Sequence, residues 1–159
     1  MRLSPLRRPV SPARRAKGGF TLLELVFAIA IVAILAVVAL SLFSKAIEKS
    51  KVGAAAADIA IIQVEMERYR TKNQNQLPEV LVTDRLDPWG RPYIYTKLEG
   101  VNGNGSARKD HALNPLNTDY DLFSAGKNGV FKTQVSQKDS LDDIIRARNG
   151  GYIGLAEDF

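Results

Sequence analysis

Only a few side chains in this sequence are of types that could take part in catalysis or bind a metal. The chain has no cysteine, which excludes disulfide bonds, thiolate metal sites and a cysteine nucleophile. His111 is the single histidine, and we expect it on a surface loop. Ser124 therefore lacks a plausible histidine base, so we do not expect nucleophilic catalysis. The remaining candidates are carboxylates: Glu24 near the start of the chain, and the adjacent Asp142 and Asp143 near its end.

Glu24 stands at the start of a long apolar stretch. Residues 25–43 are all apolar except Ser41. An acidic side chain at the centre of a membrane helix costs about 2.5–3.5 kcal/mol. Two interpretations are open: the carboxylate reaches back to the lipid headgroups, or a group of opposite charge pairs with it and offsets the cost.

The acidic pair Asp142 and Asp143 lies in a polar segment and suggests a metal. Calcium takes about 6–8 oxygen ligands and mixes carboxylates with backbone carbonyls in irregular loops. We expect roughly the last 30 residues to bury too little apolar surface to offset an ordering entropy of about 1–2 kcal/mol per residue. The segment is then either disordered or held by something else, and without cysteine a metal ion is the remaining strong link. The alternatives are a solvated acidic loop and a helix N-cap at Asp142.

The apolar stretch has about the length of a membrane-spanning helix, which needs roughly 20 residues. It is longer than the core of a secretory signal, which has about 7–15 residues. No small-residue cleavage site with a helix break follows it. We therefore interpret it as a retained membrane anchor.

The positive charge of the chain is concentrated before this anchor. Residues 1–19 hold six of the 22 basic residues and none of the 17 acidic ones. The positive-inside rule predicts that this segment stays in the cytoplasm and that the C-terminal part crosses the membrane. The rest of the chain has 16 basic and 17 acidic residues, so its charge gives no support for a nucleic-acid surface.

The helix is expected to continue beyond the anchor, over about residues 20–72, because no proline occurs between Pro12 and Pro78. Apolar residues recur there at spacings of three and four, which is the pattern of an amphipathic helix. This apolar stripe consists of Val52, Ala55, Ile59, Ile62, Met66 and Tyr69. We expect it to pack against a small domain.

After residue 76 the sequence is typical of turns and short strands. Residues 87–92, Asp-Pro-Trp-Gly-Arg-Pro, have the composition of a turn, and residues 102–106 that of a loop. Residues 93–96 and 119–124 predict two strands. The expected fold class is α+β, with one long N-terminal helix packed on a small antiparallel sheet of about three strands.

The segment Gly19-Phe20-Thr21-Leu22-Leu23-Glu24 resembles the prepilin class of type IV pilins and type II secretion pseudopilins. Leader charge, glycine, phenylalanine, glutamate and apolar run occur in the order of that class. The resemblance implies that a prepilin peptidase cuts between Gly19 and Phe20 on the cytoplasmic side and methylates the new amino group. It also implies that Glu24 pairs with the Phe20 amine of a neighbouring subunit. That pair would offset the cost of the buried acid and fix the register between subunits, as a register pin.

Further segments resemble the major, G-type pseudopilin: residues 87–93, 119–126 and 142–144. The resemblance implies a calcium site in which the side chain of Asn128 and the carbonyls of Ala125 and Val130 join Asp142 and Asp143. The sequence departs from that pattern because Asn128 replaces an expected aspartate, which removes one negative charge. The insert before the acidic pair is also longer than expected, and the chain ends differently.

The resemblance implies four segments along the chain. Residues 1–19 are a cleaved leader, and residues 20–43 form a transmembrane and filament-core helix. Residues 44–76 form an amphipathic helix that continues into the head. Residues 77–159 form a β-rich periplasmic head with a calcium-type loop.

The function implied is structural and not enzymatic: a subunit of a type II secretion pseudopilus that polymerises and drives protein export. The expected partners are further copies of the chain, other pseudopilins, prepilin peptidase, the inner-membrane assembly platform and the membrane, with no nucleic acid. We expect a single-pass inner-membrane protein with a cytoplasmic N-terminus and a periplasmic head, which then enters a periplasmic filament.

Two alternatives remain open at this point. A type IV pilin of a surface pilus, for adhesion, motility or DNA uptake, shares the sequence features up to about Met66. The absence of a cysteine pair argues mildly against it, as do the segments around residues 87–93 and 142–144. A membrane-tethered periplasmic enzyme is the other alternative, but nothing in the sequence resembles a catalytic set.

Overall fold

The computed structural model describes residues 19–100 and 105–159. Most of the expected leader and part of the loop expected at residues 102–106 lie outside the described residues. The chain divides into two compact units, Met1–Leu42 and Phe43–Phe159. Each is described by itself below.

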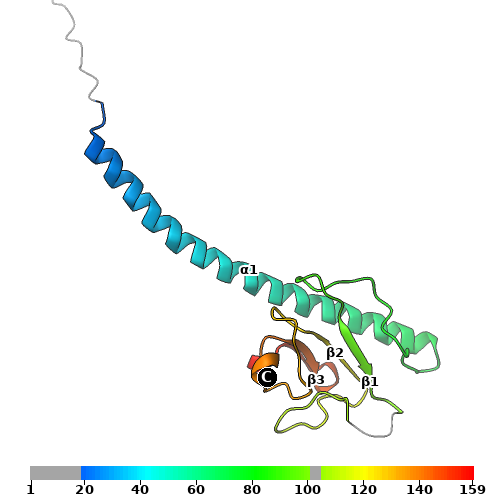
Figure 1. Ribbon diagram of the computed structural model, residues 1–159. Helices are drawn as coiled ribbons and strands as arrows, with labels where there is room; N and C mark the ends of the chain where they lie inside the picture. Colours follow the sequence, from blue (N-terminus) through cyan, green and yellow to red (C-terminus); the bar gives the residue numbers. More distant parts are fainter. Residues whose placement is uncertain (1–18, 101–104) are drawn as a thin grey trace, which may run out of the picture. The chain divides into compact units, whose positions relative to one another are not determined.

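One α-helix, α1, runs over Leu22–Lys72 (Figure 1). Its end at Lys72 agrees with the helix expected over about residues 20–72. The amide side chain of Asn73 donates to the carbonyl of Tyr69 at 2.8 Å, and the backbone N–H of Asn75 donates to the carbonyl of Arg70 at 2.8 Å. These bonds satisfy the last carbonyls of the helix and stop it.

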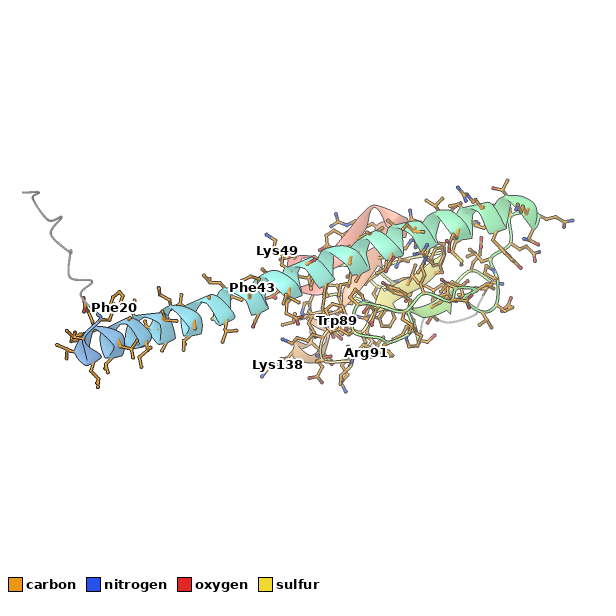
Figure 2. All side chains as sticks on the ribbon, turned by 90° about the horizontal axis from the view of Figure 1, so that it is seen from above. Phe20, Phe43, Lys49, Trp89, Arg91 and Lys138 are labelled. Atoms are coloured by element: carbon orange, nitrogen blue, oxygen red, sulfur yellow. The ribbon has the colours of Figure 1, made fainter. Side chains whose placement is uncertain are left out.

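In the first unit, α1 exposes an apolar surface. Its most apolar window of 18 residues has a mean hydropathy of 3.1, and none of that window is buried. Figure 2 shows side chains that project from all sides of the helix between Phe20 and Phe43. The helix is therefore long and apolar enough to cross a membrane, as expected.

In the second unit, four strands form one antiparallel sheet in the order β1-β2-β3-β4. They are β1 (Ile94–Lys97), β2 (Tyr120–Ser124), β3 (Ile144–Ala147) and β4 (Tyr152–Leu155). The first two were predicted from the sequence. The other two were not, so the expectation of about three strands was one too few.

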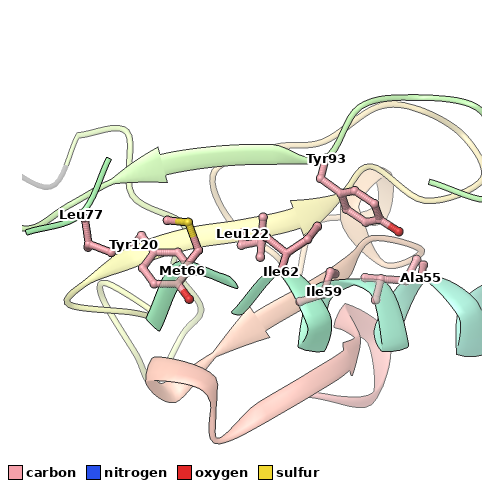
Figure 3. Close-up of a cluster of buried hydrophobic side chains, with 9 residues drawn as sticks. Ala55, Ile59, Ile62, Met66, Leu77, Tyr93, Tyr120 and Leu122 are labelled. Carbon is pink, nitrogen blue, oxygen red and sulfur yellow. The ribbon is translucent and has the colours of Figure 1, made fainter. Parts of the chain in front are cut away.

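The C-terminal half of α1 packs on one face of this sheet (Figure 3). The predicted stripe is buried at Ala55, Ile59, Ile62 and Met66, whereas Tyr69 remains 38% exposed. The sheet, its flanks and the loop after the helix complete this core with Leu77, Tyr93, Tyr120, Leu122 and Ile144. Because strand side chains alternate between faces, a second core forms on the other side with Leu116, Phe123, Val135, Ile145, Ala147 and Ala156.

The C-terminal tail contributes to both cores, which corrects the expectation that it carries too little apolar surface to order itself. Every residue of β3 is buried. Ile144 faces the helix, Ile145 faces the second core, and Phe159 stacks on Tyr152 with ring centroids 5.0 Å apart. The tail therefore folds as part of the sheet and buries its own apolar side chains.

Arg146 of β3 joins α1 to the sheet from inside. Its guanidinium donates to both carboxylate oxygens of Asp119 at 2.8 and 2.7 Å, to the carbonyl of Tyr120 at 3.0 Å and to Oε1 of Gln63 on α1 at 2.9 Å. Burial alone would raise the pKa of Asp119, but the bonds from Arg146 and from backbone N–H groups outweigh it and lower the pKa. The Asp119 carboxylate is therefore charged at neutral pH.

Candidate functional sites

The junction between Gly19 and Phe20 precedes the helix and is open to solvent. Residues 19–21 have no regular structure, and the Phe20 side chain is 87% exposed. A β-carbon placed on Gly19 would meet no atom within 4 Å. The fold itself therefore does not require glycine there, and a requirement for it would come from whatever binds the junction.

Glu24 caps the start of α1 together with Thr21. The carboxylate accepts from the backbone N–H of Thr21 at 3.2 Å and from its hydroxyl at 3.3 Å. In return, the hydroxyl oxygen of Thr21 accepts from the backbone N–H of Glu24 at 3.2 Å. This reciprocal pattern is a capping box, and the spacing Thr-x-x-Glu is its sequence signature.

The capping box gives Glu24 a use within its own chain that the sequence analysis missed. It satisfies two of the helix's unpaired N–H groups and places a negative charge at the positive end of the helix dipole. No ion pair of Glu24 occurs among residues 19–100 and 105–159. Within those ranges the cap is the interaction that the structure shows for this carboxylate.

The turn expected at residues 87–92 is closed by Asp87. Its Oδ1 accepts from the backbone N–H groups of Trp89 at 3.0 Å and Arg91 at 2.8 Å. Its Oδ2 accepts from the hydroxyl of Ser124 at 2.6 Å, and Gly90 adopts a φ of 85°, which favours glycine. The hydroxyl of Ser124 therefore donates to the carboxylate that closes the turn.

The side chains of this turn reach two other parts of the head. Trp89 packs against the helix-facing core and donates from Nε1 to Glu48 of α1 at 3.4 Å (Figure 2). Arg91 donates to the carbonyls of Gly126 and Lys127 in the turn after β2. The turn therefore ties the helix to the loop that was expected to hold calcium.

In that loop, Asn128 and Asp142 bond directly to each other. Asp142 accepts from the backbone N–H of Asn128 at 2.8 Å and from its Nδ2 at 2.6 Å. The same Nδ2 donates to the carbonyl of Asp139 at 2.9 Å. Oδ1 of Asn128, the atom expected to ligate a metal, accepts from the N–H of Val130 at 2.6 Å.

Asp143 lies elsewhere, inside the protein. Its side chain is fully buried and Oδ2 pairs with the guanidinium of Arg108 at 2.5 Å. Arg108 is also buried, with its guanidinium carbon 4.1 Å from the ring centroid of Phe123. Burial raises the pKa of Asp143 to about 6, because desolvation outweighs the attraction of Arg108. At neutral pH the pair is still ionised.

The predicted calcium ligands are divided between two sets of partners. Asn128 and Asp142 meet, Asp143 turns to Arg108, and the carbonyl of Ala125 accepts from the N–H of Gly129 at 3.1 Å. Over the described ranges, no three His, Cys, Asp or Glu side chains are grouped so as to hold a metal ion. As arranged, the buried Asp143 faces Arg108, so the predicted set of five does not form one oxygen cage around this loop.

The comparisons with known proteins bear on the start of the chain. Residues 14–40 match the family model of the prokaryotic N-terminal methylation motif, which is the prepilin-like signal of type IV pilins and pseudopilins. No curated protein and no solved structure matches the chain significantly. The match spans Gly19, Phe20 and Glu24, and the motif implies processing by prepilin peptidase and assembly into a pilus-like polymer.

Proposed function

We propose that this chain, which carries the prepilin-like methylation signal, is a structural subunit of a type II secretion pseudopilus. The observation that carries the proposal is the motif at residues 14–40, followed by a helix able to span a membrane and by a small four-stranded head. The pilin-like arrangement of a long helix and a small sheet supports a structural subunit.

Processing is the first step of the proposed function. The peptidase cuts the exposed bond between Gly19 and Phe20 on the cytoplasmic side, and the new N-terminus is methylated. The basic leader holds this end in the cytoplasm before cleavage, while the head lies in the periplasm. After cleavage, Phe20 carries a positive amine at the start of the membrane helix.

Assembly uses that amine. Glu24 caps its own helix through hydrogen bonds, and those bonds leave its negative charge unneutralised. In lipid such a charge is costly, and the Phe20 amine of a neighbouring subunit offsets the cost in one register only. The helices then bundle in the filament core, and the heads lie outside.

The choice of a secretion pseudopilus over a surface pilus rests on the head. The closed turn at Asp87, its connection to the turn after β2 and the absence of cysteine support the G-type resemblance. The methylation motif is common to pilins and pseudopilins, so it does not favour either. A surface type IV pilus is the alternative, and an experiment must distinguish it from a secretion pseudopilus.

The test of assembly compares two variants at one position in cells that contain the prepilin peptidase. Glu24→Gln keeps an oxygen that can accept from Thr21, so it preserves the cap but removes the charge. Glu24→Val removes both. Filaments are quantified in the sheared and membrane fractions and viewed by electron microscopy.

We expect both variants to insert and to be processed, and both to lose most of their filaments. If Glu24→Gln assembles as abundantly as the wild type, the charge pair with Phe20 is not the register pin. Long extracellular fibres at the natural expression level, with unimpaired export of folded proteins after deletion of the gene, would identify a surface pilin instead of a pseudopilin.

A further inference from the structure

The two acids of the C-terminal loop each have a partner within the chain, and the two partners differ in kind. Asp143 faces a cation: Arg108 reaches it at 2.5 Å, and both side chains are nearly inaccessible, at 0% and 4% exposure. Arg108 is held in place by its own backbone N–H, which donates to Asp121 at 2.6 Å, and by the ring of Phe123 below its guanidinium.

Asp142 faces a neutral donor. Asn128 offers it two N–H groups, at 2.8 Å from the backbone and 2.6 Å from the side chain. An aspartate at position 128 would put a second carboxylate at that distance and would need a cation between the two. An amide needs none, because one of its N–H groups supplies the bond directly.

Three backbone carbonyls around the loop also accept hydrogen bonds. Arg91 donates to the carbonyls of Gly126 and Lys127, and Gly129 donates to that of Ala125. Backbone carbonyls are the ligands that calcium combines with carboxylates in such loops. A calcium ion entering here would compete with these donors and lie close to the guanidinium group of Arg91.

We propose that the C-terminal loop of this head is closed without a metal ion, with Arg108 as the internal cation for Asp143 and Asn128 as the neutral donor for Asp142. The loop then keeps its structure at any calcium concentration. This inference concerns the head alone and does not depend on which kind of filament the chain forms.

The first test is calcium titration of the full mature chain in detergent micelles. The unfolding midpoint Tm of the head is followed by near-ultraviolet circular dichroism, first with a chelator and then with millimolar calcium. Calcium at about a hundred times its dissociation constant would raise the Tm of a chain of this size by roughly 5–10 °C. We expect the two values to agree within about 1 °C and calorimetry to show no binding heat.

A rise of several degrees with calcium that is lost in Asp142→Ala would overturn the proposal. The second test uses variants in the presence of chelator. Arg108→Met leaves Asp143 buried without a partner and should lower Tm by on the order of 10 °C. Arg108→Met/Asp143→Leu removes both charges and should recover most of that loss.

Asn128→Asp is the matched test of the neutral donor. It keeps size and the acceptor for Val130 but places a carboxylate against Asp142, so it should lower Tm measurably without calcium. If Asn128→Asp and the wild type are equally stable in chelator, or if the double variant is no more stable than Arg108→Met, the loop is not closed as proposed. These readouts involve no assembly, so their failure leaves the filament proposal untouched.

Discussion

Replacing Arg146 by methionine removes the guanidinium that joins α1 to the sheet while keeping much of the apolar stem. The variant loses four hydrogen bonds: two to Asp119, one to the carbonyl of Tyr120 and one to Gln63. Removing one partner of a buried ion pair costs about 3–5 kcal/mol. The Asp119 side chain retains 15% exposure, so water compensates part of its lost partner. We therefore expect a loss of roughly 2–4 kcal/mol in the free energy of unfolding.

The assay is urea unfolding of the mature chain in detergent, followed by the fluorescence of Trp89. The matched control is Lys97→Met, which breaks the ion pair of Lys97 with the 83%-exposed Glu79 side chain. A surface pair of that kind contributes about 0–1 kcal/mol. A double-mutant cycle of Arg146→Met with Asp119→Asn should give a coupling of about 1–3 kcal/mol.

An Arg146→Met variant no less stable than Lys97→Met would refute this reasoning, as would a coupling of zero in the cycle. Either result would mean that the buried guanidinium fills space and does not attach the helix to the sheet.

Three further predictions concern backbone, pH and capping. Gly126 has a φ of 59°, and a β-carbon there would collide with the carbonyl of Asp142, so Gly126→Ala should destabilise the head strongly. Gly53→Ala, at an open position of α1, should instead stabilise the protein by about 0.5–1 kcal/mol. Urea unfolding midpoints compare the two variants. The folded-state pKa of Asp119 is lowered, because hydrogen bonds from Arg146 and from backbone N–H groups outweigh burial. The contribution of Asp119 to the free energy of unfolding is therefore present above its unfolded pKa of about 3.9 and is lost as pH falls through the lower folded pKa. Stability measured across that acid range should therefore fall less steeply in Asp119→Asn, and equal slopes would contradict the assignment. Thr21→Val removes the hydroxyl of the capping box and should raise amide exchange in the first turn of α1, with a loss of about 0.5–2 kcal/mol; unchanged exchange would show that the box contributes nothing.

The helix and its buried face could be predicted because their pattern is local. Apolar residues at spacings of three and four identified the buried stripe of α1, and only Tyr69, at its end, is notably exposed. The strands β1 and β2 were found from β-branched and aromatic residues beside turn signals. Each of these signals is contained within a few consecutive residues.

The C-terminal strands β3 and β4 could not be predicted from such local patterns. β3 is buried on both faces, so it shows no alternation of polar and apolar residues, and Arg146 makes it look like a solvated segment. Its partner Asp119 lies 27 residues away, and Arg108 lies 35 residues from Asp143. A cation so distant in the chain cannot be recognised from the sequence. Asp143 was therefore interpreted as a metal ligand, although Arg108 pairs with it.

At the start of the chain, in contrast, the partner residues are close in the sequence. The spacing of Thr21 and Glu24 is a local signature of a capping box, which the sequence already contained. The proposed pairing of Glu24 with a second subunit is a property of several chains, so a single chain cannot display it.

Intact-mass analysis of the protein purified from cells that contain the prepilin peptidase tests the central claim most directly. The account predicts one dominant species that begins at Phe20 and is one methyl group heavier than the unmodified mature chain. Gly19→Leu, which the fold tolerates because no atom lies near a β-carbon there, should accumulate as the uncut precursor. A dominant wild-type species that retains residues 1–19, or normal processing of Gly19→Leu, would contradict the account.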